Sequence, residues 1–164
     1  MGTPFTQVYN RFLGKITDDM YMELTPEDTV RDLRNLLIDA IPCFEFPRKN
    51  LLDYTIIENE NALEEESSFA AELSSEEINI LAILMMINWT QRQITSIENT
   101  RMKYSSSDFK FTSQANHLAK LLTLLAEVQR QSHHMQRLYK RRKIGESGNY
   151  ESNWSMLGST SAIN

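Results

Sequence analysis

The fold is decided by residues 74–89, which read SSEEINILAILMMINW. Ser74 and Glu77 stand three residues apart at the start of this stretch, which is the spacing of a capping box, where each residue's side chain satisfies a free backbone donor of the other. The apolar run from Ile80 to Ile87 is hydrophobic nearly all round, a pattern typical of a helix buried at the centre of a core. The pattern predicts a central helix that continues to about Lys103.

A second long helix is predicted from Thr112 or Ser113, either of which can cap it, to about Arg142. Its apolar residues recur at helical spacing and are Leu118, Leu121, Leu122, Leu125, Val128, Met135 and Leu138. The polar segment 105–108 separates it from the central helix, and we expect the two long helices to form an antiparallel hairpin.

Two shorter helices are predicted near the N-terminus. One covers residues 4–16 with Thr3 as its N-cap, and the other covers residues 26–41 with Thr25 as its N-cap and ends at Pro42. Each begins with a proline, which is favoured in a first turn because its missing N–H would have no partner there. Both helices place apolar residues on one face, so we expect them to dock on the shared core.

The segment 44–74 lacks helical periodicity and forms the irregular part of the chain. It contains a short β-like run at residues 54–57 with an acidic insertion after it, and can hold a hairpin or a helical turn. From residue 144 the composition turns to Gly, Ser and Asn, which is typical of an extended tail. We therefore predict an all-α protein, with a small helical bundle domain at residues 1–143 and an extended C-terminal tail at residues 144–164.

Composition agrees with one small domain, because 164 residues of which 41% are apolar can build one modest core. Cys43 is the only cysteine, so no internal disulfide can form and the chain suits a reducing compartment. The N-terminal residues lack the unbroken apolar run of a signal peptide, and no segment approaches the roughly 20 apolar residues of a membrane span. We expect synthesis in the cytoplasm and no membrane partner.

Charge is divided unevenly along the chain, whose formal net charge is -5. No Lys or Arg occurs between Asn50 and Gln91, whereas the segment from Arg130 to Lys143 is strongly basic and contains no acid. Opposite charges can specify a contact between two different faces of identical subunits, so we hypothesise that the acidic stretch faces the basic stretch of a neighbouring copy. The residues of this hypothetical interface are Glu64, Glu65, Glu66, Glu76, Glu77, Arg137, Arg141, Arg142 and Lys143.

No catalytic, metal or cofactor site is predicted, and we do not expect an enzyme. His133 and His134 are adjacent, so on a helix they point about 100° apart, and His117 lies too far along the chain to join them on one ion. Cys43 has no motif partner that would activate it, the acidic stretch lacks the pattern of a calcium loop, and no glycine-rich phosphate loop exists. The basic stretch around Tyr139 leaves nucleic-acid binding open as an alternative.

Two features point to contacts with other chains. Asn88 stands inside the apolar stripe of the central helix, where a carboxamide is costly to bury alone, so we expect it to have a hydrogen-bond partner. The C-terminal tail contains large aromatic and apolar residues that gain little unless they dock on a partner. The candidates for such docking are Tyr150, Trp154, Met156 and Leu157.

Three stretches read together resemble a known family. They are Pro4-Phe5-Thr6-Gln7-Val8-Tyr9 with Lys15-Ile16-Thr17-Asp18, then Glu76-Glu77-Ile78-Asn79-Ile80-Leu81, and finally Ile97 to Tyr104 with Phe109 to Ser113. With these stretches the chain resembles the head-tail adaptors of tailed bacteriophages, also called connector or neck proteins.

The resemblance implies a virion structural protein at the head-tail junction, built as a small helical bundle. Identical subunits would form a homo-oligomeric ring below the portal protein, with DNA passing through its centre without sequence-specific binding. The C-terminal extension would engage the portal, and stopper or tail proteins would be further partners. The family has no catalytic residue or cofactor to transfer. A neck, stopper or tail-completion protein, or a helical nucleic-acid-binding protein of DNA packaging, stays open as an alternative.

Overall fold

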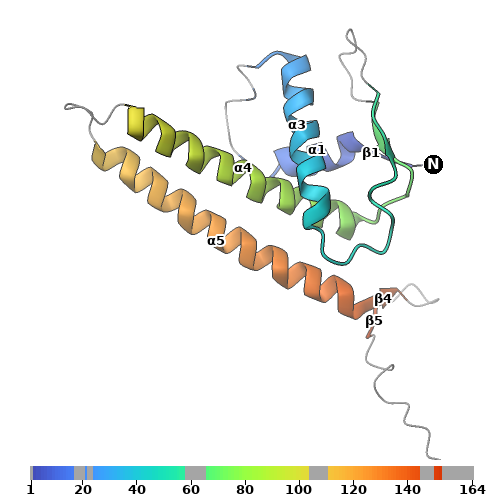
Figure 1. The fold of residues 1–164 in the computed structure, drawn as a ribbon. Helices are drawn as coiled ribbons and strands as arrows, with labels where there is room; N and C mark the ends of the chain where they lie inside the picture. Colours follow the sequence, from blue (N-terminus) through green and yellow to red (C-terminus); the bar gives the residue numbers. More distant parts are fainter. Residues whose placement is uncertain are drawn as a thin grey trace, which may run out of the picture.

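The computed structural model describes residues 2–16, 21, 24–57, 66–103, 111–144 and 150–152, and these are mostly helical, as expected from the sequence. The α-helices with given bounds are α1 (Phe5–Leu13), α3 (Pro26–Ala40), α4 (Ser75–Lys103) and α5 (Phe111–Arg141). Figure 1 shows α4 and α5 lying side by side, with α1 and α3 packed on the other side of α4. Among the described residues, no helix has both the length and the apolar character needed to cross a membrane.

The central helix α4 begins as the sequence predicts. The backbone N–H of Glu77 donates to Ser74 Oγ at 3.3 Å, and the backbone N–H of Ser74 donates to Glu77 Oε2 at 2.7 Å, which completes the capping box. Behind this cap, the residues from Ile80 to Met85 are all buried. A helix that is apolar all round is stable only when other elements cover it on several sides, and α4 is covered in this way.

Two helices cover the first half of α4. The N-cap of α3 is confirmed, because the backbone N–H of Asp28 donates to Thr25 Oγ1 at 3.2 Å. This helix ends at Ala40 and passes into a short 3-10 helix, Ile41–Cys43, that contains the expected stop at Pro42. The buried faces of α1 and α3 join α4 in one core through Phe5, Val8, Phe12, Leu33, Leu36 and Leu37.

The predicted N-cap at Thr3 is wrong. Strand β1 (Thr3–Pro4) pairs with β3 (Ser68–Phe69), and Thr3 Oγ1 accepts a hydrogen bond from the backbone N–H of Leu73 at 2.7 Å. Helix α1 therefore starts without a side-chain cap and ends at Leu13, before the expected end at residue 16. The Thr3 hydroxyl bonds to the chain after β3 and not to the first turn of α1, because Leu73, 70 positions later, lies beside it.

The irregular segment contributes to a small sheet. Strand β2 (Tyr54–Thr55) pairs with β3, which gives an antiparallel sheet of order β1-β3-β2. The short β-like run expected at residues 54–57 therefore exists as a strand at its first two residues. Most of the acidic insertion, residues 58–65, lies outside the described residues.

The start of α4 lies beside the end of α5, as shown by contacts between Glu77 and Tyr139 and between Asn79 and Met135. Helix α5 begins at Phe111, so residues 112 and 113 lie inside its first turn and not at the cap position predicted for them. After α5, strand β4 (Arg142–Ile144) pairs with β5 (Tyr150–Ser152). The expected domain boundary at residue 143 lies within β4, and residues 150–152 of the expected tail form β5, which pairs with β4.

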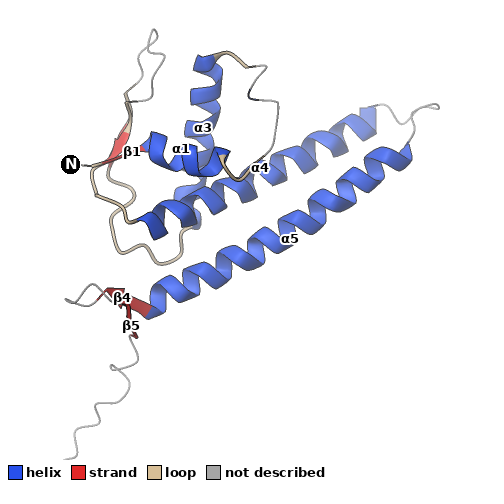
Figure 2. Ribbon diagram, turned by 180° about the vertical axis from the view of Figure 1, so that it is seen from behind, coloured by secondary structure: helices blue, strands red, loops and turns tan. Residues whose placement is uncertain are grey.

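The far half of the α4 and α5 pair extends past the core. Figures 1 and 2 show both helices continuing well beyond α1. Among the side chains that the structure describes there, the buried apolar ones are Ile94, Leu121 and Val128, which lie outside the core cluster that joins α1, α3 and the first half of α4. We call residues 93–103 of α4 and 111–128 of α5 the projection.

Candidate functional site

Exposed cations gather at the end of α5 and on the loop that crosses it. Arg137, Lys140 and Arg141 are exposed in the last turns of the helix, and Arg48 and Lys49 are exposed on the loop. The loop is fixed to the helix because the backbone N–H of Glu45 donates to Gln136 Oε1 at 2.7 Å. We call Arg48, Lys49, Arg137, Lys140 and Arg141 the basic surface.

Arg48 caps the C-terminal end of α5. Its guanidinium donates hydrogen bonds to the backbone carbonyls of Tyr139 and Arg142, and its Cζ lies 4.1 Å from the centroid of the Tyr139 ring. The last carbonyls of a helix lack partners within the helix, and a cation there also opposes the negative end of the helix dipole. A second cation is held nearby by an aromatic ring, since Lys140 Nζ lies 3.8 Å from the centroid of Phe46.

A buried polar contact supports this surface from below. Tyr139 is 1% exposed, Glu77 is 3% exposed, and the tyrosine hydroxyl donates to Glu77 Oε1 at 2.5 Å. Burial raises the pKa of the Tyr139 phenol far above its ordinary value, and the hydrogen bond to the Glu77 carboxylate raises that pKa further. Tyr139 therefore stays protonated and remains a hydrogen-bond donor.

Three residues of the hypothetical subunit interface have partners inside the chain. Glu76 forms an ion pair with Arg142 at 3.8 Å, and Glu77 is buried against Tyr139. These contacts within the chain arise because the start of α4 lies beside the end of α5, and the contact between neighbouring copies stays a prediction.

Of the other predicted site residues, five lie in the described part of the chain and five lie outside it. In the described part, Glu66, Arg137 and Arg141 are exposed, and Lys143 and Tyr150 lie in the paired strands β4 and β5. Five predicted residues lie outside the described part of the chain, namely Glu64, Glu65, Trp154, Met156 and Leu157.

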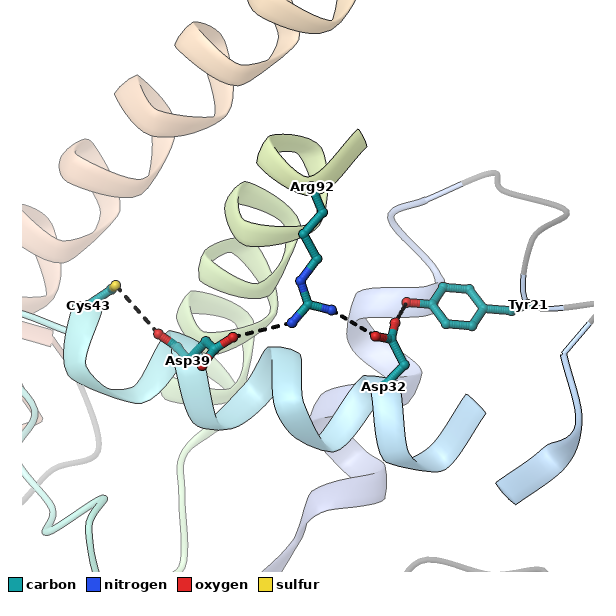
Figure 3. A network of polar contacts seen from close by, with 5 residues as sticks. All are labelled: Tyr21, Asp32, Asp39, Cys43 and Arg92. Atoms are coloured by element: carbon teal, nitrogen blue, oxygen red, sulfur yellow. Dashed lines mark hydrogen bonds and ion pairs between the residues drawn. The ribbon is translucent and has the colours of Figure 1, made fainter. Parts of the chain in front are cut away.

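A polar network joins α3 to α4 (Figure 3). Arg92 of α4 donates to Asp32 Oδ1 at 2.7 Å and to Asp39 Oδ2 at 3.3 Å, both on α3. The hydroxyl of Tyr21 donates to the other oxygen of Asp32 at 2.9 Å, and the Cys43 thiol donates to the Asp39 carbonyl at 3.7 Å. One arginine therefore fixes two turns of α3 against α4.

A groove of about 730 Å³ lies next to this network. Its lining side chains are polar and include Asn88, Gln91, Thr95 and Asn99 of α4. The hydrogen-bond partner expected for Asn88 is not found within the described residues, where its Nδ2 is buried without an acceptor. Among those same residues, no group of three His, Cys, Asp or Glu side chains is placed to hold a metal ion.

One flank of α5 in the projection remains partly uncovered. Leu122 is 49% exposed, and Leu118 and Leu125, which lie on the same flank, are half-buried. The helix uses Leu121 and Val128 to pack on α4, so these other leucines exceed what one neighbouring helix can cover. We call Leu118, Leu122 and Leu125 the leucine flank.

A second group of exposed apolar residues adjoins β2. Leu52 is exposed before this strand, and Ile56 and Ile57 are exposed after it. We call these three residues the β2 apolar group. It belongs to the irregular segment, whereas the leucine flank belongs to α5, so these two groups lie on different elements.

The basic surface combines segments that no local sequence pattern joins. Arg48 precedes its contact residue Tyr139 by 91 positions, and the only sign of it in the sequence is the basic pair Arg48-Lys49. The comparisons give no further guide, since no family model, no curated protein and no solved structure matches the chain.

Proposed function

We propose that the chain is a head-tail connector, or adaptor, of a tailed bacteriophage. In this role, identical copies assemble into a ring below the portal, and DNA passes through the ring into the tail. The proposal rests on the sequence resemblance together with one structural observation, the leucine flank. A helix flank that holds a leucine 49% exposed between two half-buried ones favours a protein that works by assembling.

The ring requires a contact between two different faces of the subunit, because a contact of one face with itself gives only a pair. The leucine flank and the β2 apolar group can supply these two faces. In the proposed ring, the leucine flank of one copy packs on the β2 apolar group of the next, and burying such side chains contributes about 1.5–3 kcal/mol each when burial is complete.

The same proposal includes the architecture of the subunit and the contacts of its C-terminal tail. The subunit is a helical bundle organised on the antiparallel hairpin of α4 and α5, with an acidic insertion at its irregular segment. The C-terminal tail contacts the portal lengthwise through Tyr150, Trp154, Met156 and Leu157, while the ring contacts are sideways. The complete particle is part of the virion and joins stopper or tail proteins below it.

Negative-stain microscopy of the purified protein, with and without the portal protein of the same phage, tests this function. We expect ringlike particles, or a ring added to the portal. A monomer that adds nothing to the portal would contradict the proposal. DNA binding with neither a ring nor a portal complex would favour the alternative of a DNA-packaging protein, and attachment only to a portal already joined to a connector would favour a stopper or tail-completion protein.

A further inference from the structure

The cations of the basic surface are largely without acidic partners. Among the described residues, no carboxylate forms an ion pair with Lys49, Arg137, Lys140 or Arg141. The nearby acid Glu76 pairs with Arg142, and Glu77 is buried under Tyr139. The positive charge of this surface is therefore not neutralised by the acids that stand closest to it at the start of α4.

The negative end of the α5 dipole does not explain why so many cations gather at this surface. Arg48 already binds the backbone carbonyls of Tyr139 and Arg142, so the negative end of α5 has its cation. Lys140 and Arg141 add two further charges at the same place, and Arg137 adds a third one turn earlier. Like charges gathered this closely repel each other, and an anionic partner removes that cost.

The placement of the cations suits an extended anion. They come from a loop and from two turns of a helix, so they spread over a surface and do not converge on one point. A pocket of about 380 Å³ beside this surface is lined by Arg137 with Arg130, His133 and Glu45, and the carboxylate among these cations makes it a poor site for a small phosphate compound. Repeated phosphates along a nucleic-acid backbone match such a spread of Lys and Arg, and need no base contact.

We infer that the basic surface binds the phosphate backbone of nucleic acid without sequence preference. The inference deepens the proposed function, because in a connector the nucleic acid would be the DNA that passes through the ring. The binding itself does not depend on ring formation. Weak binding is expected, with a dissociation constant of about 10⁻⁴–10⁻⁶ M, which is the usual range for sequence-independent contacts.

Fluorescence anisotropy with two labelled DNA duplexes of unrelated sequence, measured over a range of NaCl concentrations, tests this inference on the full chain. We expect equal affinity for both duplexes and a slope of log K against log salt of about -3. The double variant Lys140→Gln, Arg141→Gln should bind at least about tenfold more weakly, with the slope reduced by about 2.

Two matched variants serve as controls. Lys120→Gln with Arg31→Gln removes the same charge from exposed positions elsewhere, since Lys120 lies about 30 Å from Lys140 along α5. This variant should bind nearly as the original chain does. Lys140→Arg with Arg141→Lys keeps the charge and should keep the binding, which separates lost charge from altered folding.

The inference is overturned if both charge-removing variants lose affinity equally, or if no salt-dependent binding occurs. It is also overturned if the Lys140 and Arg141 variant binds DNA normally but fails to assemble, because the surface would then face another copy of the chain. If this variant binds DNA normally and still forms rings, the inference is overturned and the proposed function stands. DNA binding as expected, without any ring, contradicts the proposed function and supports the inference.

Discussion

The hydroxyl of Tyr139, near the end of α5, donates a 2.5 Å hydrogen bond to Glu77 Oε1 in the first turn of α4. The other carboxylate oxygen of Glu77 accepts from the backbone N–H and from the hydroxyl of Ser74. The buried Glu77 carboxylate therefore accepts three hydrogen bonds, and it joins the N-terminal cap of α4 to the last turns of α5. Such a carboxylate is tolerated in the interior because its charge is fully hydrogen-bonded.

Tyr139→Phe should lower the free energy of unfolding by about 1–3 kcal/mol, because the buried carboxylate loses a donor while the ring stays in place. Urea unfolding followed by circular dichroism measures this change. Tyr54→Phe is the matched control, since Tyr54 is half-buried beside the core and no hydrogen bond of its hydroxyl occurs among the described residues. Equal stability of the two variants would show that the Tyr139 hydroxyl contributes nothing.

Stability should fall in alkaline solution because of the same tyrosine. The pKa of Tyr139 is raised in the folded protein, first by burial and then by the bond to Glu77, whereas in the unfolded chain it lies near 10. Above about pH 10 the unfolded chain therefore loses this proton first, and the free energy of unfolding decreases as the pH rises. Urea unfolding between pH 8 and pH 11 should show a shallower decrease for Tyr139→Phe than for the original chain. Identical pH profiles would contradict the assignment.

Signals that act over three or four residues were sufficient to predict several elements from the sequence. The caps at Thr25 and Ser74 depend on partners three residues away, and both are confirmed. The burial of Ile80 to Met85 follows from their continuous apolar character. These features are local, so the amino-acid order alone contains them.

Contacts between distant residues could not be predicted in the same way. Thr3 looks like a helix cap, but its hydroxyl accepts from Leu73, 70 positions later. The basic pair Arg48-Lys49 does not reveal that Arg48 binds the end of α5, because the contact residue Tyr139 lies 91 positions later. Glu76 and Arg142 lie 66 positions apart, and it is the arrangement of α4 and α5 that brings them together as an ion pair. Each of these outcomes depends on the packing of whole elements.

Gly2→Ala should destabilise the protein by about 1–3 kcal/mol, because a Cβ there would stand 1.9 Å from the Phe69 carbonyl oxygen and force β1 away from β3. Gly14→Ala is the contrasting change. Gly14 has φ of -68°, and its added Cβ would meet Asn10 O at an ordinary 3.4 Å. This variant should gain about 0.4–1 kcal/mol through the lower entropy of the unfolded chain. Thermal and urea unfolding compare the two, and a Gly2→Ala variant as stable as the original chain would contradict the close packing of β1 on β3.

Arg92→Gln should lower stability by about 0.5–1 kcal/mol, since the side chain is partly exposed and its two ion pairs with Asp32 and Asp39 are screened by water. Arg130→Gln removes an exposed pair with Glu127 inside one helix and should cost less than about 0.5 kcal/mol. Urea midpoints at low and high salt measure both effects. A larger loss for Arg130→Gln would contradict the view that Arg92 fixes α3 on α4.

Assembly through the leucine flank and the β2 apolar group predicts how three serine variants should behave. Leu122→Ser and Leu52→Ser alter exposed positions, so each should leave unfolding nearly unchanged while it weakens assembly. Lys120→Ser changes an exposed residue on the opposite flank of α5 and should leave assembly unchanged. An equimolar mixture of Leu122→Ser and Leu52→Ser retains one intact contact between unlike copies, so it should give pairs but no closed ring.

Native mass spectrometry of the purified chain, recorded beside these variants, tests assembly most directly. We predict one closed oligomer of fixed subunit number for the original chain and for Lys120→Ser, monomers for Leu122→Ser and for Leu52→Ser, and pairs for their mixture. An original chain that stays monomeric at tens of micromolar both alone and with the portal protein, or a Leu122→Ser variant that assembles as the original does, would contradict assembly through these surfaces.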